Sequence, residues 1–96
     1  MTPRQWIDEQ LDGEGALVAD GFDDCIRGVV TIFNKRLVLY DTAKVIEKLE
    51  QQGMTYEEAV EYFEFNIVGA YVGEGTPAFA VFYEDENIDT NERPDV

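Results

Sequence analysis

Apolar residues recur at helical spacing between Thr55 and Ala70 and predict an amphipathic helix there. With about 3.6 residues per turn, Ala59, Phe63, Ile67 and Ala70 fall on one face, with Tyr62 beside them. Thr55 is followed three residues later by a glutamate, which is the pattern of a capping box. We therefore expect the helix to begin directly after Thr55 and to bury this apolar face.

The same helix carries a row of glutamates on another face. Glu57, Glu61 and Glu64 follow the i, i+4, i+7 spacing, and Glu58 flanks them. No lysine or arginine occurs between residues 49 and 92, so the row has no basic neighbour in the helix. Like charges at i, i+4 cost a few tenths of a kcal/mol per pair. Either a binding function or an ordinary solvated face accounts for such a row.

A shorter helix is predicted at the N-terminus and a second one before the glycine at position 53. Thr2-Pro3 reads as an N-cap followed by an N1 proline, which opens a helix through about Asp12 with Trp6, Ile7 and Leu11 inward. Asp41-Thr42 caps a helix over Ala43–Gln52, and Gly53 is placed for the left-handed residue that follows a helix. Met54 then precedes the Thr55 cap, as in a hydrophobic staple.

Three stretches predict strands. Residues 25–33 are β-branched and mostly apolar, and residues 36–40 return as RLVLY after a turn at Asn34-Lys35. Gly28 inside the first stretch indicates a bulge or a close backbone approach. Residues 78–83 predict a third strand.

These elements predict one α+β domain over residues 1–83. We expect a three-stranded antiparallel sheet with the helices Ala43–Gln52 and Thr55–Ala70 packed on one face and a short N-terminal helix. Residues 84–96 are polar, acidic and end near a proline, so we expect a flexible tail.

Charge changes this picture more than any motif does. The chain has 21 acidic and 7 basic residues, which gives a net charge of −14, beyond the magnitude of roughly 2–8 that suits a small domain. Such a charge excludes nonspecific attraction to nucleic acid and to anionic membranes. It permits attraction to basic surfaces, and most basic surfaces in a cell hold nucleic acid.

The remaining composition limits the chemistry. The chain has no histidine, the commonest general base, and a single cysteine, Cys25, which excludes an internal disulfide. The apolar neighbours of Cys25 indicate a buried small residue. The N-terminus is too polar for a signal peptide, and the apolar runs are far shorter than the about 20 residues that span a bilayer. We expect a cytoplasmic protein that is not an enzyme and needs no cofactor.

The glutamate row can imitate a run of phosphates. Carboxylates one helical turn apart are separated by about 5–6 Å, which is comparable with the phosphate spacing of a DNA strand that advances about 3.4 Å along the axis per step. The first candidates for partner contact are Glu57, Glu58, Glu61 and Glu64. A second group comprises Asp23, Asp24, Glu74, Glu84, Asp85 and Glu86.

Other interpretations of the same residues stay open. Asp20, Asp23 and Asp24 could bind calcium or magnesium, although they lack the EF-hand spacing. Paired glutamates could do acid–base chemistry, although nothing in the sequence marks a pocket. Phe65 beside the acidic row is either core, an exposed contact anchor, or with Val68 the seam of a homodimer.

The segment from Tyr40 to Phe79 resembles a family of small acidic proteins, mostly uncharacterised, encoded by tailed bacteriophages. The shared pattern is GMTYEEA, EYFEFN and GAYVGEGTP. Family members often carry Asp before the first glycine of this pattern, where this chain has Gln52. The resemblance implies a phage origin and no mechanism. By charge and size the chain is also similar to phage proteins that inhibit host gyrase, nucleases or CRISPR effectors by imitating DNA.

We therefore expect a phage-encoded DNA mimic that binds the basic, DNA-binding surface of a host enzyme and inhibits it, without binding nucleic acid or membrane itself. The alternative is a non-catalytic phage structural or adaptor domain whose acidity serves solubility. A metal-dependent enzyme is a third class, and calcium or magnesium binding would distinguish it.

Overall fold

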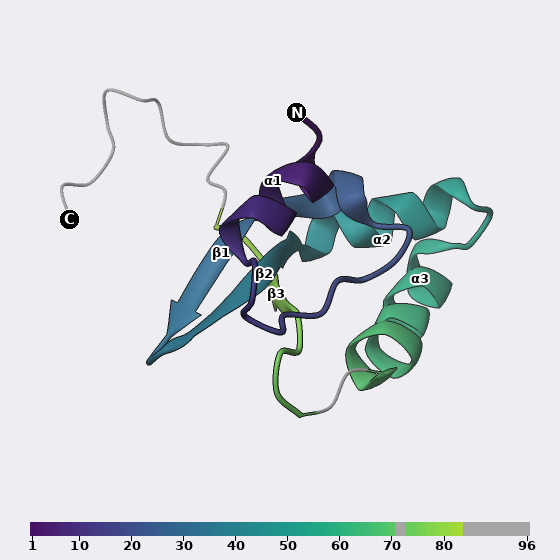
Figure 1. Ribbon diagram of the computed structural model, residues 1–96. Helices are drawn as coiled ribbons and strands as arrows, with labels where there is room; N and C mark the ends of the chain where they lie inside the picture. The colour runs from purple at the N-terminus through teal and green to yellow at the C-terminus, as the bar shows by residue number, and fades with distance from the viewer. Residues whose placement is uncertain (71–72, 84–96) are drawn as a thin grey trace, which may run out of the picture.

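The computed structural model describes residues 1–70 and 73–83 and has an α+β fold (Figure 1). Three helices, α1 (Pro3–Gln10), α2 (Thr42–Gln51) and α3 (Tyr56–Tyr62), accompany a sheet of three strands, β1 (Ile26–Ile32), β2 (Lys35–Asp41) and β3 (Ala78–Ala80). A 3₁₀ turn over Asp23–Cys25 leads into β1. The predicted tail from residue 84 lies outside the described residues.

The sheet is mixed, so the prediction of a purely antiparallel sheet is wrong. β1 and β2 form the expected antiparallel hairpin, but β3 pairs parallel to β2, with Tyr40 opposite Phe79. A parallel neighbour requires a crossover connection, and α2 and α3 supply it between β2 and β3. The third strand is also shorter than the predicted 78–83, because only Ala78–Ala80 pair with β2.

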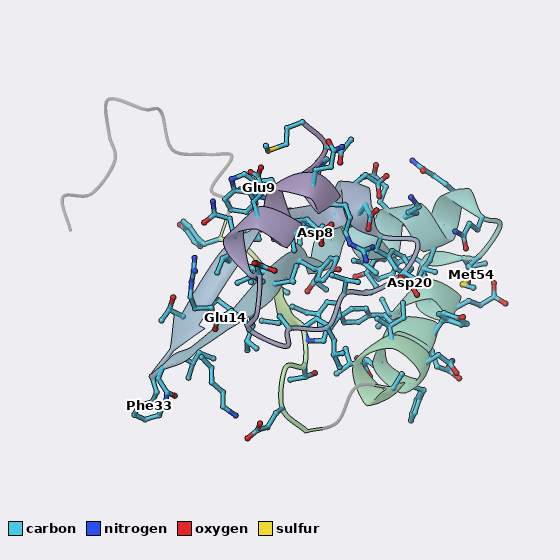
Figure 2. All side chains as sticks on the ribbon, in the orientation of Figure 1. Asp8, Glu9, Glu14, Asp20, Phe33 and Met54 are labelled. Carbon is cyan, nitrogen blue, oxygen red and sulfur yellow. The ribbon has the colours of Figure 1, made fainter. Side chains whose placement is uncertain are left out.

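The β1–β2 hairpin closes one residue earlier than predicted. Ile32 pairs with Lys35, so the two-residue loop is Phe33-Asn34 rather than Asn34-Lys35. Phe33 has a φ of 55°, in the left-handed region that bulky residues seldom adopt, and its side chain is 97% exposed at the tip of the hairpin (Figure 2). The predicted bulge is confirmed, because the register shifts between Ile26 and Gly28.

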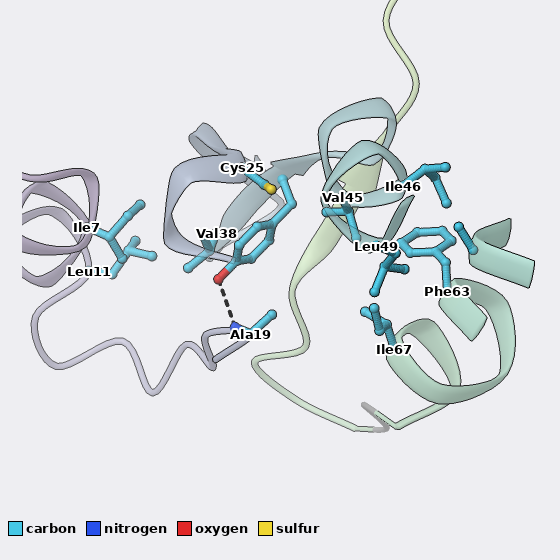
Figure 3. Close-up of a cluster of buried hydrophobic side chains, with 12 residues drawn as sticks. Ile7, Leu11, Ala19, Cys25, Val38, Val45, Ile46, Leu49, Phe63 and Ile67 are labelled. Atoms are coloured by element: carbon cyan, nitrogen blue, oxygen red, sulfur yellow. Dashed lines mark hydrogen bonds between the residues drawn. The ribbon is translucent and has the colours of Figure 1, made fainter. Parts of the chain in front are cut away.

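One face of the sheet carries the core. Side chains alternate along a strand, so Val38 and Tyr40 of β2 point to the same face, and both are fully buried. They share one hydrophobic cluster with Ile7 of α1, Leu49 of α2 and Phe63, which follows α3 (Figure 3). All three helices thus bury their apolar sides in a single core. Trp6, predicted to point inward, is 37% exposed.

A long connector between α1 and β1 is fastened to this core. The backbone N–H of Ala19 donates to the buried Tyr40 hydroxyl at 2.7 Å, drawn as a dashed line in Figure 3. The N–H of Leu17 donates to the carbonyl of Gly75 at 2.8 Å. Gly75 approaches the connector so closely that a Cβ at this position would collide with the carbonyl oxygen of Gly15. The connector therefore links the hairpin to the segment that leads into β3.

The helix predicted over Thr55–Ala70 is one helical segment with three geometries. It is α-helical over Tyr56–Tyr62, π-helical over Phe63–Ile67 and 3₁₀ over Val68–Ala70. Ala59, Phe63 and Ile67 are buried as predicted, whereas Ala70 is exposed and Tyr62 is 42% exposed. The change of helical pitch explains the exposure of Ala70, because a constant period of 3.6 residues no longer applies after Tyr62.

Candidate functional site

The acidic side of α3 is set by the burial of its apolar side and by its cap. Thr55 is the N-cap, and its hydroxyl accepts from the backbone N–H of Glu58 at 3.2 Å. The carboxylate of Glu58 in turn accepts from the N–H of Thr55 at 2.9 Å, which completes the predicted capping box. With Ala59 and Phe63 buried beneath, Glu57 and Glu61 are left exposed to solvent.

Glu58 is a structural residue as well as an acidic one. The hydrogen bond from the Thr55 backbone lowers the pKa of the Glu58 carboxyl below its ordinary value, and the Thr55 side chain lowers it further. A hydrogen bond to the charged form of a carboxyl favours that form. Glu58 is therefore ionised at physiological pH and fixed in orientation.

The α3 carboxylates lie together on one helical segment and, like Glu9, Asp12, Glu14, Glu47 and Glu50, form no ion pair among the described residues. Among the described residues, no ion pair involves Glu57, Glu61 or Glu64, and all three are exposed. The described cations that form ion pairs do so elsewhere: Arg4 with Asp8, Asp20 and Asp23; Arg27 with Asp41; Lys35 with Glu74; Lys48 with Asp24. The negative charge of α3 is thus left uncompensated. We call Glu57, Glu58, Glu61 and Glu64 the α3 acidic row.

The second group of predicted contact residues differs from this row in having cations of the protein beside it. Asp23 lies 3.7 Å from Arg4, Asp24 accepts a hydrogen bond from Lys48 at 2.9 Å, and Glu74 lies 3.2 Å from Lys35. Each of the three therefore lies beside a cation, although Asp23 shares Arg4 with Asp8 and Asp20. The other members of the group, Glu84, Asp85 and Glu86, lie outside the described residues.

The π-helical segment alters the row itself. Glu64 lies in that segment, after the pitch has changed, so it no longer continues the line through Glu57 and Glu61 at the α-helical angle. The same segment presents Phe65, which is 73% exposed, and Asn66, which is also exposed. Of the interpretations of Phe65, burial in the core is therefore excluded.

A shallow hollow lies beside the α3 acidic row. Its lining residues come from the turn before α3, from α3 and from the π-helical segment: Met54, Glu58, Glu61, Tyr62, Phe65 and Asn66. A second depression on the other side of Tyr62 and Asn66 is lined by Asp20, Phe22 and Leu49, among others. Sequence periodicity did not predict either one, because both depend on a pitch change and on how the connector and α2 pack beside α3. Phe65, an aromatic residue next to the acidic row in the sequence, was the feature that could have indicated the first hollow.

The groups considered for metal or nucleophilic chemistry have other roles. Arg4 lies within 4.0 Å of Asp20, and Lys48 binds Asp24. In the turn over residues 20–24, these carboxylates therefore already face cations of the protein itself. Cys25 is buried as predicted, and burial together with the Asp24 carboxylate raises the pKa of its thiol to about 11. A thiol with that pKa is a poor nucleophile at neutral pH.

No protein-family model, no curated protein and no solved structure matches this chain. Within residues 1–70 and 73–83, no helix is long and apolar enough to cross a membrane. In that same part of the chain, no group of three or more His, Cys, Asp or Glu side chains is arranged to hold a metal ion.

Proposed function

We propose that this protein is a non-catalytic acidic inhibitor that binds the basic, DNA-binding surface of another protein. The observation that carries the proposal is the α3 acidic row, whose exposed carboxylates have no ion-pair partner among the described residues. A row of carboxylates on a helix takes positions that phosphates occupy on DNA, and Lys and Arg of the partner neutralise it. The net charge of −14 adds long-range attraction to such a partner.

The resemblance of Tyr40–Phe79 to acidic phage proteins supports a more specific form of the proposal. In that form the protein is phage-encoded and acts in the host cytoplasm on a DNA-handling enzyme of the gyrase, nuclease or CRISPR effector class. The segment of resemblance comprises α2, α3 and the β3 residues Ala78 and Phe79, which pair with Leu39 and Tyr40. It therefore includes the whole α3 acidic row.

The experiment compares two variants with equal loss of charge. One carries Glu57→Gln, Glu61→Gln and Glu64→Gln on the α3 side, and the control carries Glu9→Gln, Asp12→Asn and Glu14→Gln, which are exposed residues near α1. Proteins captured from host lysate by the unaltered chain are identified, and their DNA binding and enzymatic activity are measured with each variant.

We expect the α3 variant to lose capture and inhibition and the control variant to retain both. Capture should weaken steeply as salt rises, because exposed charges are screened, and DNA should compete with the protein for the partner. Equal losses in the two variants would mean that net charge alone is responsible, and unchanged inhibition in both would reject the proposal.

The second candidate function is a phage structural or adaptor domain, and the exposed apolar side of the hairpin favours it. Ile32 is 49% exposed and Phe33 97%, both at the tip of the hairpin. Apolar exposure of this kind suits an assembly contact. This function predicts association that persists at high salt and is unaffected by the Gln variant of α3.

A further inference from the structure

The lining of the hollow beside the α3 acidic row combines apolar side chains, which we call the floor, with carboxylates, which we call the rim. Met54, Tyr62 and Phe65 supply the apolar side chains, and Glu58 and Glu61 supply the carboxylates. Tyr62 is 42% and Phe65 73% exposed, so these rings are accessible to a partner. A surface that only imitated phosphates would have no use for exposed aromatic rings next to its carboxylates.

The protein fixes the shape of this hollow from three sides. Met54 packs against the core from the turn before α3, and the capping box holds the Glu58 carboxylate against Thr55. Phe63 and Ile67 are both buried, so the π-helical turn between them keeps Phe65 on the outside. Single π-helical turns occur frequently at functional sites, where they re-aim side chains.

The rows of α3 place the floor and the rim side by side. Glu58 and Tyr62 are spaced at i, i+4 in α3, and Glu61 follows Glu58 at i+3. Phe65 and Asn66 come next in the π-helical segment, and all five residues line the hollow. An apolar group that entered the hollow would lie between Tyr62 and Phe65. Cationic groups flanking it would meet Glu58 and Glu61.

Charge complementarity therefore selects the occupant. We propose that this hollow binds one large apolar side chain of a partner protein, carried on a segment with Lys or Arg on both sides of it. The apolar side chain is buried against Met54, Tyr62 and Phe65, and the cations pair with the rim carboxylates. The inference rests on the proposed function for the basic character of the partner, and it adds an anchor that screening by salt does not remove.

The test uses the full chain and helical peptides of about 15 residues that carry Lys and Arg around one central position. The central residue is Leu, Met, Phe or Trp in four probes and Ser in a fifth of the same charge. Affinity is measured by calorimetry at low salt and at about 0.5 M NaCl. We expect at least one apolar probe to bind about tenfold more tightly than the Ser probe. This ratio should persist at high salt, whereas all absolute affinities fall.

Two exposed aromatic residues provide the matched variants. Phe65→Ser should abolish the preference for the apolar probes and leave binding of the Ser probe unchanged. Tyr56→Ser, at a position that is 63% exposed on the same helix but outside the hollow, should keep the preference. Far-UV circular dichroism confirms that both variants are folded.

The outcomes separate this inference from the proposed function. If all five probes bind alike, or none binds, the hollow is not a docking site, although the charge variants can still block capture of a DNA-binding protein. If the preference is found but no DNA-binding protein is captured, the hollow is confirmed and the proposed function fails. Self-association that Phe65→Ser removes would identify a second copy as the occupant and overturn the inference.

Discussion

The surroundings of Cys25 make its thiol unreactive. Its side chain is buried, its thiol donates weakly to the Asp24 carboxylate at 3.7 Å, and burial raises the thiol pKa to about 11. We expect almost no reaction with a disulfide reagent at about pH 8 in native buffer and complete reaction in urea, because the thiolate is the reactive form. Absorbance of the released thiol measures both rates, and rapid labelling of the folded protein would contradict this expectation.

Tyr40 joins the core to the connector through one hydroxyl group. Replacement of Tyr40 by Phe leaves the buried N–H of Ala19 without this acceptor, which should lower the free energy of unfolding by about 1–3 kcal/mol. Tyr56→Phe is the control, because Tyr56 is 63% exposed, and it should change stability by much less. Urea denaturation measures both variants, and equal effects would mean that the Tyr40 hydroxyl is not important for stability.

Individual residues with a strong local preference were predicted well. Thr55 and Glu58 formed the capping box, Gly53 adopted a positive φ of 106°, and Cys25 was buried. Phe33 was not predicted at a left-handed position, because nothing in its own chemistry favours that backbone. The pairing of Ile32 with Lys35 imposes it.

At the scale of the element, the cap of α3 predicts a measurable shift in the pKa of Glu58. The folded-state pKa of Glu58 lies below its ordinary value, so ionised Glu58 stabilises the fold above the ordinary pKa. That stabilisation is lost as the pH falls through the folded-state pKa. We expect the NMR titration of the Glu58 carboxyl to have a midpoint below that of an ordinary glutamate, and Thr55→Ala should return it toward the ordinary value. A midpoint that Thr55→Ala does not move would contradict the capping geometry.

Substitutions of two glycines before β3 distinguish the cost of backbone strain from the cost of a steric clash. Gly73 and Gly75 have φ values of 94° and 81°, but only Gly75 lies against the carbonyl of Gly15. We expect Gly73→Ala to cost about 1–2 kcal/mol because of its left-handed backbone. Gly75→Ala should cost clearly more, because its Cβ also displaces the connector. Thermal unfolding compares the two, and equal losses would show that the connector yields without cost.

The elements themselves were predicted more reliably than their arrangement. Caps and apolar periodicity located α1, α2, the start of α3 and the hairpin, since those signals are local. The parallel pairing of β3 was missed, because the direction of a third strand depends on the path of α2 and α3 rather than on residues 78–80. The π-helical turn was missed because the apolar spacing that predicted the burial of Phe63 and Ile67 does not specify the helical pitch.

At the scale of the whole molecule, the unpaired charge has a cost in stability. The net charge of −14 repels itself in the compact state, and the α3 acidic row contributes without ion pairs to offset it. We expect the melting temperature to rise as NaCl increases to about 0.5 M, because salt screens this repulsion. The Gln variant of Glu57, Glu61 and Glu64 should melt higher than the unaltered chain at low salt and respond less to salt. A melting temperature that falls with salt would show that attractive ion pairs dominate.

The sequence predicted which charged residues form the candidate site, but it did not predict the shape of the surface around them. The spacing of Glu57 and Glu61 placed them on an exposed face, because helix periodicity determines that directly. The ion pairs of Asp23, Asp24 and Glu74 were not predicted, since each meets a cation that is distant in sequence. The sequence contains the charges of such pairs but not their distances.

The parallel pairing of β3 also determines when the fold of this chain can be completed during synthesis. The hairpin and α2 use contacts that are local in sequence, but Phe79 must emerge from the ribosome before its ring can stack on Tyr40 and meet the edge of Phe63. Until then Phe63, on the buried side of the helical segment, lacks its contact with Phe79. The packing behind the acidic row is thus completed only after Phe79 has been made, so a nascent fragment that ends before β3 should be unable to engage a partner of this surface.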